Sequence, residues 1–257
     1  MKRTQTFGVV QGLQEVADGI FLLTLLSPDI AQTAEPGQFV NVKAPDTQST
    51  PFLRRPFSIS HVHDDAIDLL FNVIGTGTKM LASLRKGDSL DVLGPLGRPF
   101  GYDDTYGTAV MVAGGLGVAP FPFLKTVVAD KGRSSLAIVG ARTGAQLFTD
   151  PFDAVECATD DGSAGFHGTV VQLMKNILKD TTVRQPKIFG CGPTPMLKAL
   201  SAAAKELDVP CEISLEGDMA CGIGLCQGCP VETTTGTRKY QLVCTEGPTF
   251  NCEEVIL

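Results

Sequence analysis

The stretch that decides the fold is Thr108-Ala109-Val110-Met111-Val112-Ala113-Gly114-Gly115-Leu116-Gly117-Val118-Ala119-Pro120. It opens with a continuous apolar run, turns through three glycines and leads into an apolar segment with helical character that ends near Ala129. A buried strand, a glycine turn and a helix in this order are typical of a dinucleotide-binding unit, in which the helix N-terminus faces a pyrophosphate. Pro120 suits an early helical position, where its missing N–H costs nothing.

The chain downstream repeats this alternation. Strands are predicted at 135–140, 155–159 and 187–190, and amphipathic helices around 170–178 and 196–207. Apolar strands that alternate with helices predict a doubly wound parallel sheet covered on both faces, here over residues 103–214. Glycine-rich tips at 161–163 and 190–194 follow two of the strands, at the edge where such sheets bind ligands.

Three cysteines of this region need separate interpretations. Cys191 lies in one of the glycine-rich tips, where it is either a small residue filling a tight turn or a contact for a nicotinamide ring. Cys157 and Cys211 lie in apolar strands and are expected in the core.

Residues 1–102 show a different pattern. Short alternating or apolar runs at 20–25, 38–42, 57–60, 67–73 and 89–93 are separated by Gly, Pro and Asp, and only 78–84 is expected to be helical. This spacing predicts a small antiparallel β barrel. Two of its segments can bind an anion or a flat ring: Arg54-Arg55-Pro56-Phe57-Ser58, and Gly75-Thr76-Gly77-Thr78 at the start of the helix. Each alone is weak, because arginine pairs are commonly solvated and a Gly-Thr-Gly segment is commonly just a turn.

Near the C-terminus, Cys221, Cys226 and Cys229 are spaced C-x4-C-x2-C in a glycine-rich loop, and Cys244 follows. This is the plant-type spacing for a [2Fe–2S] cluster, and it predicts a small cluster-binding module over residues 215–257. Four cysteines also suit a structural zinc site, although zinc usually shows two C-x2-C knuckles. Disulfides are a further alternative. Cys252 is not placed by spacing and is expected to be incidental.

Composition narrows the class of protein. The net charge of −7 gives no nucleic-acid footprint, and the three histidines show no metal-like spacing. The N-terminus lacks the apolar segment of a signal peptide, and no apolar run approaches a membrane span. A cytoplasmic protein is expected, and in a reducing compartment eight cysteines favour a metal site over disulfides.

Together the motifs resemble one family, the electron-transfer subunits of type B dihydroorotate dehydrogenase, within the ferredoxin–NADP reductase superfamily. The resemblance covers nearly the whole chain, and Met219-Ala220-Cys221-Gly222-Ile223-Gly224 is its most specific element. The segments that carry it, in order, are 55–58, 75–78, 93–97, 113–120, 160–165, 191–196 and 219–224.

The resemblance implies site residues by position. Phe57 is a departure, since related chains often carry Ile there, and it should alter flavin packing without abolishing binding. The implied FAD-binding residues are Arg55, Pro56, Phe57, Ser58, Leu70, Phe71, Asn72, Gly77 and Thr78. Those on the nicotinamide-nucleotide side are Gly114, Gly115, Gly117, Asp161, Cys191, Gly192, Pro193 and Thr194. The cluster ligands are Cys221, Cys226, Cys229 and Cys244.

The resemblance also implies an activity. Hydride from NADH reduces FAD, electrons pass singly to the [2Fe–2S] cluster, and an FMN-containing catalytic subunit interconverts dihydroorotate and orotate in pyrimidine biosynthesis, within a heterotetramer of two copies of each subunit. The same cofactors serve NAD(P)H:ferredoxin oxidoreductases, sulfide dehydrogenases and hydrogenases, so the partner stays open. A non-catalytic zinc-bearing binding module is the alternative from another class. NAD is expected over NADP, although Arg142 follows a central strand where it can meet a 2′-phosphate.

Overall fold

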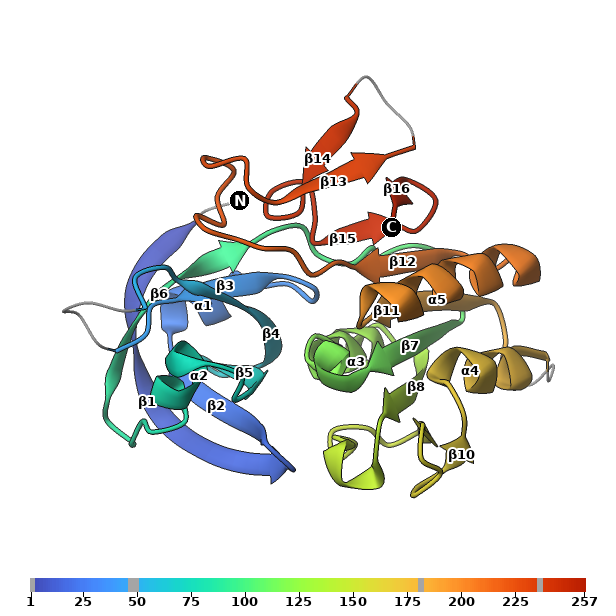
Figure 1. Cartoon of the computed structure of the whole chain (residues 1–257), viewed down its shortest axis with the longest axis horizontal. Helices are drawn as coiled ribbons and strands as arrows, with labels where there is room; N and C mark the ends of the chain where they lie inside the picture. Colours follow the sequence, from blue (N-terminus) through green and yellow to red (C-terminus); the bar gives the residue numbers. More distant parts are fainter. Residues whose placement is uncertain (1–2, 46–50, 180–182, 235–237) are drawn as a thin grey trace.

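The structure is a computed structural model, and it describes residues 3–45, 51–179, 183–234 and 238–257. Figure 1 shows three parts: a β barrel, an α/β unit beside it, and a small C-terminal module lying across the top of both. Within the described ranges, no helix is long and apolar enough to cross a membrane.

The N-terminal part is a closed antiparallel barrel, as predicted, with the strand order β1-β2-β5-β4-β3-β6. Strand β1, the longest of the described strands, is not predicted from the sequence, because its many polar residues lie at both half-buried and exposed positions and conceal the period. The predicted helix begins two residues earlier than expected and ends at Leu81. The elements are β1 (Thr4–Ala17), β2 (Ile20–Leu26), α1 (Pro28–Ala31), β3 (Phe39–Val42), β4 (Arg55–His63), β5 (Ala66–Asn72), α2 (Thr76–Leu81) and β6 (Ser89–Leu96).

The second part is a seven-stranded sheet of order β10-β9-β8-β7-β11-β12-β15. All its neighbouring strands run parallel except β12 and β15, which pair antiparallel. The glycine turn after β7 forms a short 3-10 turn, η1 (Gly115–Val118), so α3 begins only at Phe121. The remaining elements are β7 (Thr108–Gly114), α3 (Phe121–Asp130), β8 (Ser134–Ala141), η2 (Gly144–Gln146), β9 (Val155–Thr159), β10 (Phe166–His167), α4 (Val170–Lys179), β11 (Pro186–Cys191), α5 (Thr194–Leu207), β12 (Cys211–Ser214) and β15 (Thr249–Asn251).

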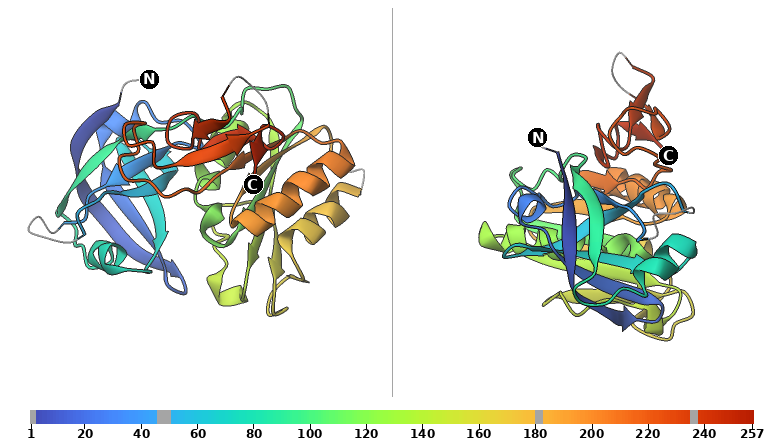
Figure 2. Two further views of the ribbon diagram at one scale, coloured as in Figure 1. Left: turned by 45° about the horizontal axis from the view of Figure 1, so that its top comes forward. Right: turned by 90° about the vertical axis from the view of Figure 1, so that its left-hand side faces the viewer.

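The C-terminal module contains a small antiparallel sheet of order β14-β13-β16, formed by β13 (Pro230–Thr233), β14 (Tyr240–Leu242) and β16 (Val255–Ile256). Figure 2 shows this sheet standing above the rest of the molecule. The module also supplies β15, the edge strand of the large sheet. The pairing of β15 with β12 is not predictable from the sequence, because a three-residue strand has no periodic signal of its own.

Apolar packing joins the three parts. Phe39 and Leu96 lie on the barrel but belong to a core cluster that also contains Cys229, Val243 and Phe250 of the module. On the other side of the barrel, Leu70 and Ile20 pack with the α/β unit. The module and the α/β unit are therefore both seated on the outside of the barrel wall.

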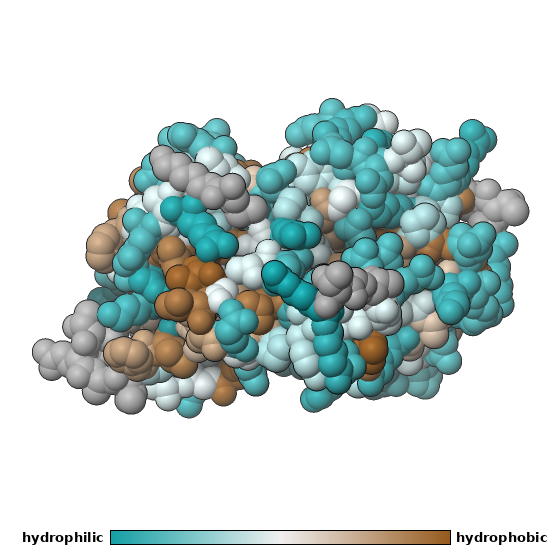
Figure 3. Space-filling model, turned by 90° about the horizontal axis from the view of Figure 1, so that it is seen from above, coloured by the Kyte–Doolittle hydropathy of each residue, from teal (hydrophilic) through white to brown (hydrophobic). Residues whose placement is uncertain are grey.

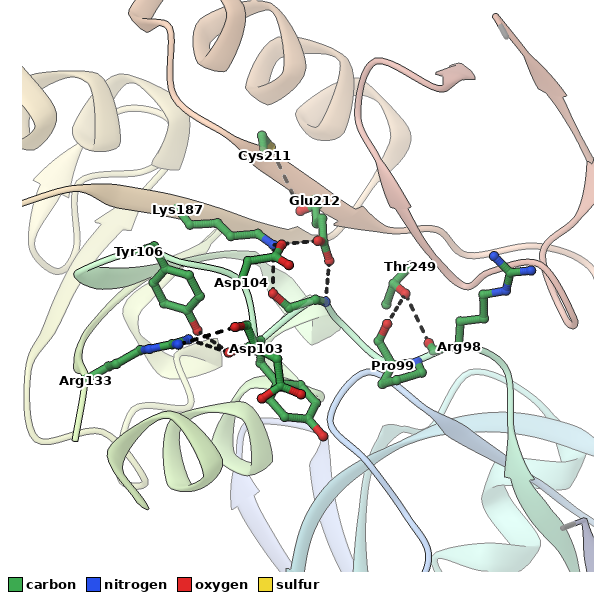
Figure 4. Close-up of polar contacts among 12 residues, drawn as sticks. Arg98, Pro99, Asp103, Asp104, Tyr106, Arg133, Lys187, Cys211, Glu212 and Thr249 are labelled. Carbon is green, nitrogen blue, oxygen red and sulfur yellow. Dashed lines mark hydrogen bonds and ion pairs between the residues drawn. The ribbon is translucent and has the colours of Figure 1, made fainter. Parts of the chain in front are cut away.

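The segment that leaves the barrel is held by polar contacts, which Figure 4 shows. Nζ of the buried Lys187 donates to the carbonyl oxygen of Gly101 at 2.8 Å, and the N–H of Gly101 donates to Oε2 of Glu212 at 2.7 Å. The Thr249 hydroxyl donates to the carbonyl oxygens of Arg98 and Pro99. Strands β11, β12 and β15 thus fix the course of the connection between the two large parts.

Candidate cofactor-binding sites

Arg55 and Gly77 meet where β4 begins and α2 begins. A Cβ placed on Gly77 would lie 2.5 Å from Nε of Arg55, so only a glycine lets the guanidinium lie against the backbone here. Thr78 Oγ1 accepts hydrogen bonds from the N–H groups of Ile74 and Gly75, which shapes this turn. A guanidinium beside the first turn of a helix has the charge and the donors that suit a phosphate group.

The two arginines of the predicted pair differ in role. Arg54 is held away from Gly77, because its guanidinium donates to Oδ2 of Asp91 at 2.6 Å and to the carbonyl oxygen of Asp91 at 3.0 Å. Only Arg55 lies beside α2, which agrees with the choice of Arg55 from the motif.

Aromatic side chains near this turn face the barrel interior. The rings of Phe57 and Phe71 have centroids 5.9 Å apart, and Phe71 belongs to the barrel core. Leu70 instead faces the α/β unit, and Asn72 is half-buried at the end of β5. Pro56 and Ser58 alternate with Phe57 along β4, so their side chains lie on the opposite face of the strand. FAD contact by these residues remains a prediction.

The predicted nucleotide-binding glycines converge at the carboxyl ends of β7 and β11. A Cβ on Gly117 would lie 2.2 Å from the carbonyl oxygen of Cys191, and one on Gly192 would lie 3.0 Å from the nitrogen of Gly114. Pro193 packs against Gly114 in the same way, and Thr194 begins α5. The two loops can therefore approach this closely only with glycines.

Asp161 lies along the same edge of the sheet but farther out, at the end of β9, with β8 between it and β7. Its Oδ1 accepts hydrogen bonds from the Ser163 hydroxyl at 2.6 Å and from the Ser163 N–H at 2.9 Å. These bonds lower the pKa of the Asp161 carboxyl. The carboxylate is thus charged and held in place at the rim of the nucleotide side.

Cys191 is buried, with 4% of its surface exposed. Burial, with a smaller effect from the nearby Glu216 carboxyl, raises the pKa of its thiol to about 12. The structure fits the interpretation of a small residue filling a tight turn, and contact with a nicotinamide ring remains a prediction. Of the two cysteines expected in the core, Cys211 is buried. The expectation for Cys157 is wrong, because it is only half-buried on β9, next to the short edge strand β10.

The four predicted cluster ligands lie as two pairs. Cys221 and Cys226 interact through their side chains, as do Cys229 and Cys244, and Cys244 also interacts electrostatically with Cys221. No three His, Cys, Asp or Glu side chains of the described residues come close enough together to hold one metal ion. The two interacting pairs suit two iron atoms, each taking two thiolates.

Backbone donors of the loop already face one of these sulfurs. The N–H groups of Cys226 and Ile223 lie 3.3 Å and 3.5 Å from Sγ of Cys221. Burial alone raises the pKa of the Cys221 thiol, but these hydrogen bonds outweigh it and bring the pKa to about 7. Donors aimed at a sulfur stabilise its thiolate form and, in iron–sulfur sites, tune the potential. The donor set therefore fits an iron–sulfur cluster.

Cys252 has a different neighbour. Its N–H donates to the carbonyl oxygen of Cys211 at 3.0 Å across the β12–β15 pair, and the two buried thiols interact with each other. The structure thus places Cys244 beside the loop and Cys252 away from it. All eight cysteines are within the described ranges, and none forms a disulfide.

Asn41 on β3 is a residue that sequence analysis missed. It is fully buried, and its Nδ2 donates to the carbonyl oxygen of Cys221 at 3.2 Å. The available signal was a polar residue inside the apolar run 38–42, at a position that alternates with Val40 and Val42.

The comparisons with known proteins agree with this geometry. The model for the iron–sulfur cluster binding domain of dihydroorotate dehydrogenase B matches residues 216–256. The electron transfer subunit of dihydroorotate dehydrogenase B (NAD(+)) from Desulforamulus reducens is 38% identical over 249 residues, which cover 94% of each chain. The chain belongs to the family of dihydroorotate dehydrogenase B electron transfer subunits. Subunits of the same name from Bacillus velezensis and Listeria innocua are 35% and 38% identical over at least 95% of each chain.

A solved structure confirms the predicted fold class of this chain, an antiparallel barrel followed by a parallel-sheet domain. A structure of NADH-dependent reduced ferredoxin-NADP oxidoreductase, from work on flavin-based electron bifurcation, has a TM-score of 0.84 at 28% identity and covers 97% of this chain and 89% of its own. A ferredoxin NADP+ reductase from Neisseria gonorrhoeae with bound FAD and NADP has a TM-score of 0.66 at 17% identity, over 79% and 91% of the two chains, and shows the fold alone. The resemblance stated from the motifs, and the electron-transfer function that it implies, are confirmed at the level of the family.

Proposed function

We propose that this chain carries electrons between NAD(H) and an FMN-containing dihydroorotate dehydrogenase catalytic subunit, using FAD and a [2Fe–2S] cluster. The observation that carries the proposal is the seating of the cysteine loop on the barrel wall, where Asn41 of β3 bonds to Cys221 and β3 pairs with β4. The strand with the flavin motif and the loop with the cluster motif are therefore separated by a single strand.

The residues near α2 support FAD binding. Arg55 and the first turn of α2 supply positive charge and N–H donors for the pyrophosphate, and Pro56 and Ser58 offer a flat strand surface to the ring. When bound, FAD supplies hydride chemistry and the cluster supplies single-electron chemistry. The protein's part is to orient the groups and exclude water, so no general acid or base is assigned.

The loops after β7 and β11 support nucleotide binding on the other side. Gly114 and Gly117 let the turn after β7 pack against residues 191–194, and Gly115, with no atom within 4 Å of its Cβ position, leaves the turn open to a pyrophosphate. The Asp161 carboxylate at the rim favours a free ribose 2′-hydroxyl over a 2′-phosphate. NAD is therefore the proposed nucleotide, and relatives carry NAD(+) in their names.

The surface around the cysteine loop is the proposed docking face for the catalytic subunit. Leu225, between two of the cysteines, is 79% exposed. An open groove of about 710 Å³ runs beside it, lined by residues that include Gly224, Gln227 and Tyr240. Figure 3 looks onto this side of the molecule and shows hydrophobic side chains mainly toward the left of the view, with smaller patches elsewhere. If each cluster faces one catalytic subunit, the two subunits are present in equal numbers, as in the proposed heterotetramer of two copies of each.

The second candidate is a reductase subunit that serves a ferredoxin. It is favoured by the TM-score of 0.84 to the NADH-dependent reduced ferredoxin-NADP oxidoreductase structure, over nearly the whole of this chain. For either function we infer a cytoplasmic location, because eight unpaired cysteines suit a reducing compartment.

Purification of the chain together with its partner tests the proposal. We expect a coloured protein with one FAD and two irons per chain and a co-purifying FMN subunit, in a complex that reduces NAD at the expense of dihydroorotate. A partner without FMN that is active with ferredoxin would support the second candidate instead. A colourless protein with bound zinc would contradict both.

A further inference from the structure

Asn41 is a buried polar side chain in the apolar contact between the barrel and the cluster module. Its strand neighbours Val40 and Val42 belong to the barrel core. Phe39 lies on the same face of β3 as Asn41 and packs in the cluster shared with Cys229. The Asn41 side chain, which is 0% exposed, therefore points out of the barrel and into the module.

The carboxamide is closely fitted to the cysteine loop. Its Nδ2 faces the carbonyl oxygen of Cys221, and only the nitrogen of an amide can do so, which fixes the orientation of the group. A Cβ on Gly222 would lie 2.1 Å from this Nδ2, and Gly222 has a φ of +68°. The Asn41 amide thus occupies the space that only a glycine leaves free after Cys221.

The other atom of the carboxamide has no partner. Oδ1 of Asn41 is buried and unpaired among the described residues, and it lies 3.5 Å from the Cβ position of Gly222. An unpaired buried acceptor costs free energy, and an apolar side chain of the same size would avoid that cost. Packing alone therefore does not explain an amide at this position, whereas the hydrogen bond from Nδ2 to the carbonyl oxygen of Cys221 does.

On its other side Asn41 is joined to the strand that carries the flavin motif. In the β3–β4 ladder it pairs with Pro56, and the Asn41 carbonyl oxygen lies 3.4 Å from the Arg54 guanidinium. One residue therefore links the proposed flavin strand with the backbone of a proposed cluster ligand.

We propose that Asn41 is a positioning residue that holds the Cys221–Gly222 peptide against the barrel and so sets the potential of the cluster and its placement relative to the flavin. Hydrogen bonds and solvent access around ligand sulfurs are the protein's means of tuning such a potential. With the carbonyl of Cys221 fixed, the backbone donors to its sulfur are fixed as well. The inference rests on the proposed function and on Cys221 as a ligand.

The test uses Asn41→Leu and Asn41→Asp in the full chain, co-purified with its partner. FAD and iron content, the cluster midpoint potential by EPR-monitored titration, and the rate of cluster reduction after mixing with NADH are measured. We expect Asn41→Leu to keep FAD and iron, to shift the midpoint potential, and to slow cluster reduction about tenfold, the change that the loss of one interaction of about 1.4 kcal/mol gives. Asn41→Asp places a negative charge beside the loop and should give a lower potential than the wild type and than Asn41→Leu.

Gln38→Leu is the matched control. Gln38 is also a fully buried amide next to β3, but its Nε2 donates to the carbonyl oxygen of Gly97 and its Oε1 accepts from Glu35, away from the loop. This variant should lose stability and keep the wild-type potential. If Asn41→Leu does not load iron, Asn41→Ser, whose hydroxyl is too short to reach Cys221, takes its place in the same measurements.

The inference would be overturned if an iron-loaded Asn41 variant kept the wild-type midpoint potential and rate of cluster reduction. It would also be overturned if Gln38→Leu shifted the midpoint potential equally. Failure of the proposed function gives a different result, because the wild-type protein itself would then lack FAD or iron.

Discussion

Gly117 lies directly against the carbonyl of Cys191, so that a Cβ on Gly117 would be only 2.2 Å from the carbonyl oxygen and 2.4 Å from the carbonyl carbon. Both contacts are with backbone atoms, which cannot move aside as a flexible side chain can. The distance between the β7 and β11 loops, and with it the shape of the proposed nucleotide site, thus depends on this glycine.

We expect Gly117→Ala to push these loops apart. Overpacking of this kind costs about 1–3 kcal/mol of folding free energy. The variant should keep FAD but bind NADH more weakly, which a titration of flavin reduction would measure. Gly12→Ala is the control, because Gly12 has no atom within 4 Å of its Cβ position and no positive φ. Equal NADH affinity in the two variants would contradict the assignment.

The exposed thiol of Cys226 gives a clean test of the cluster ligands. Since Cys226 is exposed, Cys226→Ser should leave the fold intact and act only through lost iron ligation. We expect low iron content, retained FAD and no electron transfer to the partner. Iron analysis and the visible spectrum are the measurements. Transfer that continues with FAD bound would show that the cysteine loop is not the exit for electrons.

Cys244 and Cys252 can be separated in the same way. Cys244 lies beside Cys229, whereas Cys252 lies beside Cys211 on the neighbouring strand. Cys244→Ser should therefore lose iron, and Cys252→Ser should keep it. The opposite result would make Cys252 the fourth ligand and would require the end of the chain to rearrange.

The sequence is informative where the chemistry is local. The spacing of Cys221, Cys226 and Cys229 and the glycines after β7 each lie within a few residues, and the structure keeps them together. Arg55 and Gly77 are 22 residues apart in the chain, and only the motif resemblance joined them in advance. A contact between two residues that are distant in the chain leaves no periodic pattern in the sequence from which it could be predicted.

The contacts between parts of the chain escaped prediction for the same reason. Asn41 meets Cys221 across 180 residues, and β15 joins β12 after the whole cysteine loop has intervened. Pairing in a sheet and seating on a barrel wall depend on the final arrangement of all three parts, so a short strand or a single polar residue gives no local evidence of either.

The choice between NAD and NADP is expected to depend on Asp161. Its carboxylate is ionised, since hydrogen bonds from Ser163 lower its pKa, and it would repel a 2′-phosphate. Asp161→Asn keeps the size and the acceptor oxygen for Ser163 but removes the charge. We expect kcat/KM with NADPH to rise several-fold relative to that with NADH, from steady-state rates. An unchanged ratio would show that Asp161 does not determine this choice, and Arg142, which follows β8 at the same edge, would be tested next.

The buried Lys187 should be the most sensitive charged residue for stability. Its Nζ lies 2.6 Å from Oε1 of Glu212, also contacts the Asp104 carboxylate, and has 5% side-chain exposure. Lys187→Met would leave the Glu212 carboxylate, 17% exposed, without its counter-charge. Removing one partner of a buried pair costs about 3–5 kcal/mol. We expect a loss near the lower value, measured by urea unfolding, since Asp104 is largely exposed.

Lys175→Met is the matched control for this change. Lys175 Nζ also lies 2.6 Å from a carboxylate oxygen, Oε2 of Glu206, but the Glu206 side chain is 61% exposed. A solvent-exposed pair of this kind contributes little to the free energy of unfolding. If the two variants lost the same stability, the pair at Lys187 would not hold the connecting segment. If only Lys187→Met also weakened NADH reduction of the flavin, the Lys187–Glu212 pair would be fixing the barrel against the α/β unit, because both residues hydrogen-bond to Gly101.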